Sequence, residues 1–115
     1  MAKPIRIAKI NAEIVRTISK ILTELNDPEI VNSLITVTKA NTSEDFYQTK
    51  VYVSIYGDAV KKQAVLASLE KAKGKVRREL ALGIDLRIVP EIIWVLDDSL
   101  EKSERINKIL EDLKG

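Results

Sequence analysis

The residues with the clearest chemical potential are basic, and they are concentrated in one stretch of the chain, Val60 to Leu82. From Ala59 to Arg78, seven bases stand against one acid, Glu70. The bases are Lys61, Lys62, Lys71, Lys73, Lys75, Arg77 and Arg78. Because the whole chain carries a net charge of only +2, a segregated basic stretch favours a polyanionic partner such as nucleic acid. The alternative interpretation is a solvated helix face with no partner.

The two ends of the chain have opposite charge. Met1 to Lys20 holds five bases, including Arg6 and Lys9, against the single acid Glu13. The last 25 residues, 91–115, hold seven acids against four bases. We therefore expect Arg6 and Lys9 to extend the basic surface of the central stretch.

Catalytic chemistry is poorly supported. The chain has no cysteine and no histidine, which excludes thiolate catalysis, disulfides, Cys/His zinc sites and histidine-based triads. A Ser-x-x-Lys pattern occurs twice, at 68–71 and 99–102, but the companion motifs of serine acylating enzymes are missing. Asp97 and Asp98 are better explained as residues that begin a helix. We predict no catalytic, metal or cofactor site, and a protein that is not an enzyme.

Three elements can be predicted before the basic stretch. Apolar residues recur with a helical period from Arg6 to about Leu25, and Pro28 follows the end of that helix. The segments 34–41 and 49–56 alternate and are rich in β-branched residues. The polar residues 42–45 between them are short enough for a turn, so the two strands should form an antiparallel hairpin.

The basic stretch itself predicts an amphipathic helix with an interruption. Its apolar residues lie three or four positions apart, and Asp58 before it suits an N-cap. Gly74 falls inside the apolar pattern, where glycine costs about 1 kcal/mol relative to alanine. We expect a break there, whose free backbone N–H groups would suit a phosphate. The alternative is that Gly74 only relieves packing against a neighbouring element.

The remaining chain predicts a strand and a helix. Residues 84–96 read as a largely buried strand that contains Pro90, which requires a bulge or an edge position. Asp97, Asp98 and Ser99 should begin a final helix. The order is helix, strand, strand, kinked helix, strand, helix, in one α+β domain, 1–115, with a three-stranded sheet packed on helices. No signal peptide or membrane span is predicted, so we expect a soluble cytoplasmic protein.

The order of elements and several local motifs resemble the ribosome-binding factor A family. The motifs are RIAKINAEIVRTISKIL, ITVTKANTSEDFYQTKVYVS, KGKVRREL, LRIVPEIIW and DDS followed by INKIL. The resemblance implies a KH-like fold of type II, in which an alanine-x-glycine kink takes the place of the G-x-x-G loop. Ala72, Lys73 and Gly74 match that kink, and the chain lacks the extended tail of some members.

The resemblance also implies a function. Members of the family are non-enzymatic assembly factors that bind 16S ribosomal RNA in the immature small subunit and assist its late maturation, including in the cold. The implied partners are that RNA, ribosomal proteins and, in some organisms, a GTPase that aids release; off the ribosome a monomer is expected. Two alternatives are a protein-interaction domain that docks an acidic partner and a general KH-type binder of single-stranded RNA.

Overall fold

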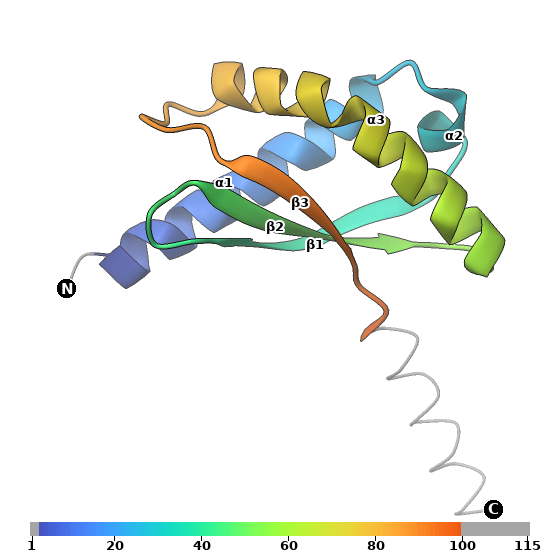
Figure 1. The fold of residues 1–115 in the computed structure, drawn as a ribbon, viewed down its shortest axis with the longest axis horizontal. Helices are drawn as coiled ribbons and strands as arrows, with labels where there is room; N and C mark the ends of the chain where they lie inside the picture. Colours follow the sequence, from blue (N-terminus) through green and yellow to red (C-terminus); the bar gives the residue numbers. More distant parts are fainter. Residues whose placement is uncertain (1–2, 100–115) are drawn as a thin grey trace, which may run out of the picture.

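The computed structural model describes residues 3–99 as an α+β domain with helices packed on one sheet (Figure 1). The elements are α1 (Lys3–Glu24), α2 (Pro28–Val31), β1 (Ile35–Thr42), β2 (Gln48–Ile55), α3 (Ala59–Gly83) and β3 (Glu91–Leu96). The predicted final helix lies outside the described residues apart from its first position, Ser99. Within the described part, no helix is long and apolar enough to cross a membrane.

The sheet has the strand order β1-β2-β3, with β1 antiparallel to β2 and β3 parallel to β2. The antiparallel hairpin predicted from the sequence is therefore confirmed. Alternation along β2 buries Val51 and Val53 completely, while Lys50 and Tyr52 lie on the opposite face. Helices α1 and α3 cover the face that holds the buried valines, and no other helix within residues 3–99 covers the opposite face (Figure 1).

A β-bulge in β1 changes which residues of that strand face the core. The pairing with β2 shifts between Val37 and Lys39, so that Ala40 and Thr42 are buried after the bulge. The hydroxyl of Thr42 lies 3.1 Å from that of Thr49, which pairs the two buried hydroxyl groups with each other. A strict alternation read from the sequence does not reveal this change of phase.

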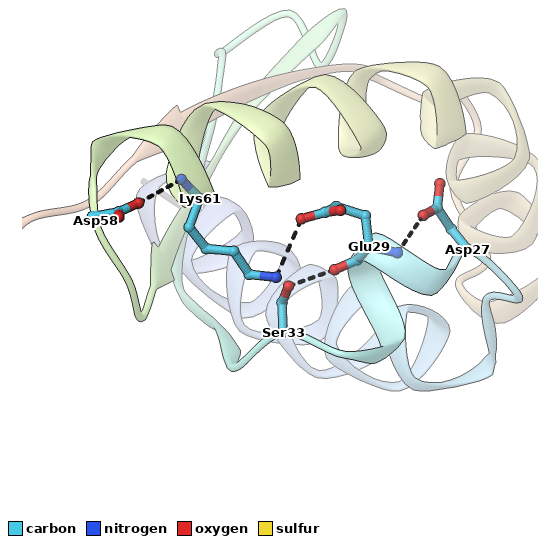
Figure 2. Close-up of polar contacts among 5 residues, drawn as sticks. All are labelled: Asp27, Glu29, Ser33, Asp58 and Lys61. Atoms are coloured by element: carbon cyan, nitrogen blue, oxygen red, sulfur yellow. Dashed lines mark hydrogen bonds and ion pairs between the residues drawn. The ribbon is translucent and has the colours of Figure 1, made fainter.

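The short helix α2 was not predicted from the sequence. The Asp27 side chain caps it by accepting a hydrogen bond from the Glu29 N–H at 2.9 Å, and Pro28 occupies the first turn. The Lys61 ammonium group of α3 lies 3.2 Å from the Glu29 carboxylate (Figure 2). The Asp58 side chain in turn caps α3 by accepting from the Lys61 N–H at 2.8 Å, as predicted. The contact between α2 and the start of α3 is therefore partly ionic.

The predicted kinked helix is confirmed, because the axis of α3 bends in the yellow part of the ribbon (Figure 1). A full break at Gly74 is wrong, because α3 is one continuous α-helix of 25 residues and helical structure continues through the bend. Buried residues on both sides of Gly74 hold the helix to the core, and this burial outweighs the roughly 1 kcal/mol cost of one glycine. There is consequently no internal helix N-terminus for a phosphate.

The predicted strand over residues 84–96 is correct only in its second half. Residues 84–90 form an irregular segment, and β3 begins after Pro90, whose side chain is fully buried. The Glu91 N–H donates to the Tyr47 carbonyl at 2.8 Å, so the strand pairs from its first residue. Proline has no N–H to donate, which explains why it precedes the ladder and does not interrupt it.

The Asp97 carboxylate links the end of β3 to β1 and should make folding pH-dependent. Hydrogen bonds from the Ser99 hydroxyl, from the Thr38 hydroxyl at 2.6 Å and from the Ser99 N–H lower its pKa from 3.8 to about 2. A lowered pKa gives stability that is present above about pH 4 and is lost as the pH falls through about 2. We expect Asp97→Asn to flatten the fall in the free energy of unfolding between pH 4 and 2, measured by urea denaturation. An unchanged pH profile would contradict this assignment.

Candidate nucleic-acid interface

The two faces of α3 differ in burial. Val65, Leu69, Val76 and Leu80 are fully buried against the sheet and α1. The opposite face is turned to solvent and contains a shallow hollow of about 330 Å³. The hollow is lined by Gly74, Arg77, Arg78, Ala81 and Val89. The buried stripe thus fixes the orientation of this face, which we call the α3 outer face.

Gly74 has no local structural reason to be glycine. Apart from its chain neighbours and the backbone of its own helix, no heavy atom of the described residues would lie within 4 Å of a Cβ atom built on it, and its φ is not in the left-handed region. The alternative from the sequence, that Gly74 relieves packing against another element, is therefore wrong. The missing side chain leaves the helix backbone open to close approach from outside.

The cations around the hollow fall into two groups. Lys73 pairs with Glu70 at 2.7 Å, and the Arg77 guanidinium donates to the Val89 carbonyl at 2.8 Å. Three exposed cations make no side-chain hydrogen bond or ion pair with other described residues. These are Lys71, Lys75 and Arg78. They are the positive charges of the outer face that a polyanion can engage without breaking an internal contact.

Three other residues predicted for the site are less available for contact with a polyanion. Ala72 is half-buried against the core, so its side chain points away from the outer face. Lys61 is paired with Glu29, and Lys62 is half-buried beside it at the start of α3. Gly74 lies thirteen positions after Lys61 along the helix, which is a distance of about 20 Å. The predicted residues therefore do not form one compact cluster.

Arg6 and Lys9 do not line the hollow on α3. They line a separate cleft with Phe46 of the β1–β2 loop, and the Arg6 guanidinium carbon lies 5.7 Å from the centre of the Phe46 ring. The hollow on α3 touches the same segment through Val89. Arg6 and Lys9 therefore line a different hollow from the cations of α3, and the extension of the basic surface to α1 stays a prediction. Sequence reasoning missed Phe46, because an aromatic residue in a polar loop carries no distinctive pattern.

Chemistry other than binding finds no support in the described part of the chain. No group of three or more acidic residues there could hold a metal ion. The carboxylates of Asp45 and Asp97 have lowered pKa values, the first because it accepts from the Ser43 hydroxyl and the Tyr47 N–H. Both carboxylates are occupied by hydrogen bonds that stabilise a turn or a strand end. Neither lies in the hollow or the cleft.

The mixed three-stranded sheet, the helices on one face and the order helix, strand, strand, helix, strand define a KH-like domain of type II connectivity. The model of the family described as Ribosome-binding factor A matches residues 6–110. The chain belongs to this family. The resemblance seen in the sequence is thereby confirmed.

Relatives and solved structures agree with this assignment. A ribosome-binding factor A of Clostridium acetobutylicum is 40% identical over 111 residues, covering 96% of this chain and 91% of the relative. The crystal structure of ribosome-binding factor A from Thermus thermophilus superposes with a TM-score of 0.70 at 23% identity, covering 78% of this chain and 94% of that one. A homology model of the Thermus thermophilus protein, fitted into a cryo-electron-microscopy map of a 30S complex, gives 0.66 at 22%, covering 80% and 96%.

Proposed function

We propose that this chain is an assembly factor that binds 16S ribosomal RNA in the immature small ribosomal subunit and assists late maturation without catalysis. The family membership supports this proposal, as does the 30S complex into which the Thermus thermophilus relative was fitted. In this view the protein acts in the cytoplasm as a monomer, also at low temperature. Ribosomal proteins and a release GTPase are its further partners.

The observation that carries the proposal is the α3 outer face. Lys75 and Arg78, which pair with no other residue in the part of the chain that the structure describes, flank a glycine that meets no described neighbour outside its own stretch of helix. A sugar-phosphate backbone needs cations for its charge and a surface without side chains for close approach. Both requirements are met on one face of one rigid helix.

Binding of this kind acts through shape and charge. Phosphate contacts position a protein on folded RNA without reading its sequence. A protein that binds one RNA conformation more tightly than another shifts the population toward the first. The factor would thus favour a particular conformation of the immature subunit, and no bond needs to be made or broken.

Neutralising the α3 outer face should weaken binding to small subunits. Each phosphate contact adds about 0.7 to 0.9 to the slope of log affinity against log salt, because it releases counterions. At 0.1 M salt, one contact therefore raises the affinity roughly five- to eightfold relative to 1 M salt. We therefore expect Lys75→Gln with Arg78→Gln to lower the affinity about 25- to 60-fold, measured by co-sedimentation with purified small subunits. The slope of log affinity against log salt should fall in magnitude by about 1.4 to 1.8.

The matched control removes the same charge from the open face of the sheet. Lys39 and Lys50 are exposed there, on the side opposite α3, and Lys39→Gln with Lys50→Gln should leave the affinity within about threefold. Equal losses in both double variants would mean that only net charge matters. Unchanged binding in the α3 variant would remove the outer face from the proposal, and binding that survives RNase would favour a protein partner.

A further inference from the structure

A second cleft, separate from the α3 hollow, has the features of a small-molecule site. Its volume is about 540 Å³, within the range of ligand pockets. Its cations are Arg6 and Lys9 of α1 and Arg87 of the segment 84–89, and Ile10, Ile84 and Leu86 are among its apolar residues. A lining that combines apolar residues with cations suits a ligand that is flat at one end and anionic at the other.

The aromatic residue of this cleft is held in an unfavourable backbone conformation. Phe46 has a φ of +64° and is the one non-glycine residue with positive φ among residues 3–99. Its N–H donates to the Ser43 carbonyl at 3.0 Å, and the next residue, Tyr47, accepts from Glu91 of β3. A bulky side chain in the left-handed region is strained, and such strain is concentrated at ligand sites. The hairpin therefore holds the Phe46 ring at the cleft at a cost to the loop.

The Phe46 ring has one polar neighbour that matters for recognition. The Arg6 guanidinium lies over it, 5.7 Å from the ring centre. Aromatic rings and guanidinium planes are the two protein surfaces on which unpaired bases of RNA stack. Arg6 is exposed and Phe46 is half-buried, so a base can displace the guanidinium or stack beside it.

We propose that this cleft binds a single unpaired nucleotide of the RNA, with its base against Phe46 and its phosphate against Lys9 and Arg87. The inference rests on the proposed function, because it names a second RNA contact of the same protein. The proposed contact in the cleft is of a different type from the contact on the α3 outer face. The outer face contacts backbone phosphates, whereas the cleft takes a base out of the stack.

Two carboxylates in the cleft give the site a base preference. Glu13 and Asp85 line it together with the three cations. Carboxylates accept hydrogen bonds from exocyclic amino groups, which adenine, cytosine and guanine carry and uracil lacks. They also repel phosphate, so the net charge of the cleft is only about +1. A nucleotide with an amino-bearing base should therefore bind better than uridine monophosphate.

The test uses the full chain and the four nucleoside 5′-monophosphates, followed by NMR. We expect adenosine, cytidine or guanosine monophosphate to give saturable amide shifts in residues 6–10, 44–47 and 84–88, with uridine monophosphate binding at least about threefold more weakly. Phe46→Leu keeps an apolar side chain in the same backbone conformation but loses the π-face, and it should weaken binding about tenfold. Phe46→Tyr should bind within about threefold of the native chain.

Controls separate this inference from the proposed function. Tyr56 is an exposed aromatic residue away from the cleft, and Tyr56→Leu should leave nucleotide binding unchanged. Arg87→Gln should weaken it without touching the Phe46 loop. Absence of localised shifts, or equal shifts in the Phe46→Leu chain, would overturn the cleft assignment.

A second arm measures small-subunit binding with the same variants. Phe46→Leu should lower the affinity about tenfold, and Phe46→Tyr should restore it. If the native chain binds subunits and Phe46→Leu binds equally well, the cleft assignment fails while the proposed function stands. If the native chain does not bind subunits at all, the proposed function fails whatever the nucleotides do.

Discussion

Replacing Gly74 by glutamate should abolish binding to small subunits while making the protein more stable. Outside the helix backbone and the two chain neighbours, no heavy atom of the described residues lies within 4 Å of a Cβ at this position, and glutamate is favoured over glycine in a helix by about 0.5 kcal/mol. The new carboxylate lies three and four residues before Arg77 and Arg78, where it can pair with either guanidinium. It also repels phosphate. We expect a loss of affinity of at least about a hundredfold, measured by co-sedimentation at fixed salt.

Two variants at the same position separate size from charge. Gly74→Ala adds one methyl group and should raise the free energy of unfolding by about 0.5–1 kcal/mol. Gly74→Gln has nearly the shape of the glutamate variant without its charge. If close approach matters, alanine and glutamine weaken binding in order of size; if charge alone matters, only glutamate does. Full binding by the glutamate variant would show that RNA does not contact the α3 outer face.

The regular elements were predictable because their side-chain periodicity coincides with their burial. The apolar residues of α1 recur with a helical period, and Ile14 and Ile18 are fully buried. The β-branched residues of the hairpin alternate, and Val51 and Val53 are fully buried. In these elements the local pattern and the tertiary contacts favour the same structure.

The wrong predictions come from places where tertiary contacts decide. The segment 84–90 is as apolar as a strand but is irregular, and its residues Ile84 and Pro90 are buried without being part of a ladder. The bulge after Val37 reverses which residues of β1 face the core. No residue type in that strand predicts a bulge. Helix α3 continues through Gly74 because its buried residues on both sides anchor it to the core.

The candidate site was predictable as charge but not as geometry. The sequence places Lys61 in the same basic stretch as Arg78, yet Lys61 is paired with Glu29, a contact across 32 residues. Long-range pairing of this kind cannot be read from a charge pattern. The positive φ of Phe46 is equally invisible, because nothing in a phenylalanine side chain predicts the left-handed region. The cleft could therefore not be predicted from the sequence.

The largest loss of stability should come from the buried face of the helix whose outer face we propose as the RNA contact. Leu80 is fully buried, and truncating a buried leucine to alanine costs about 2–5 kcal/mol because a cavity remains. We expect Leu80→Ala to lower the free energy of unfolding by that amount and the melting temperature by on the order of 10 °C. Urea denaturation and calorimetry measure the two quantities.

Leu82, two residues further along the same helix, provides the control. Its side chain is 78% exposed, so Leu82→Ala should change the free energy of unfolding by less than about 0.5 kcal/mol. The Ile84 N–H donates to the Leu80 carbonyl through the main chain alone, so we expect Leu80→Ala to preserve this helix end. Subunit affinity of that variant, measured well below its melting temperature, should stay within about threefold. A larger loss would mean that the packing of α3, and not only its outer charges, determines how it presents Arg77 and Arg78.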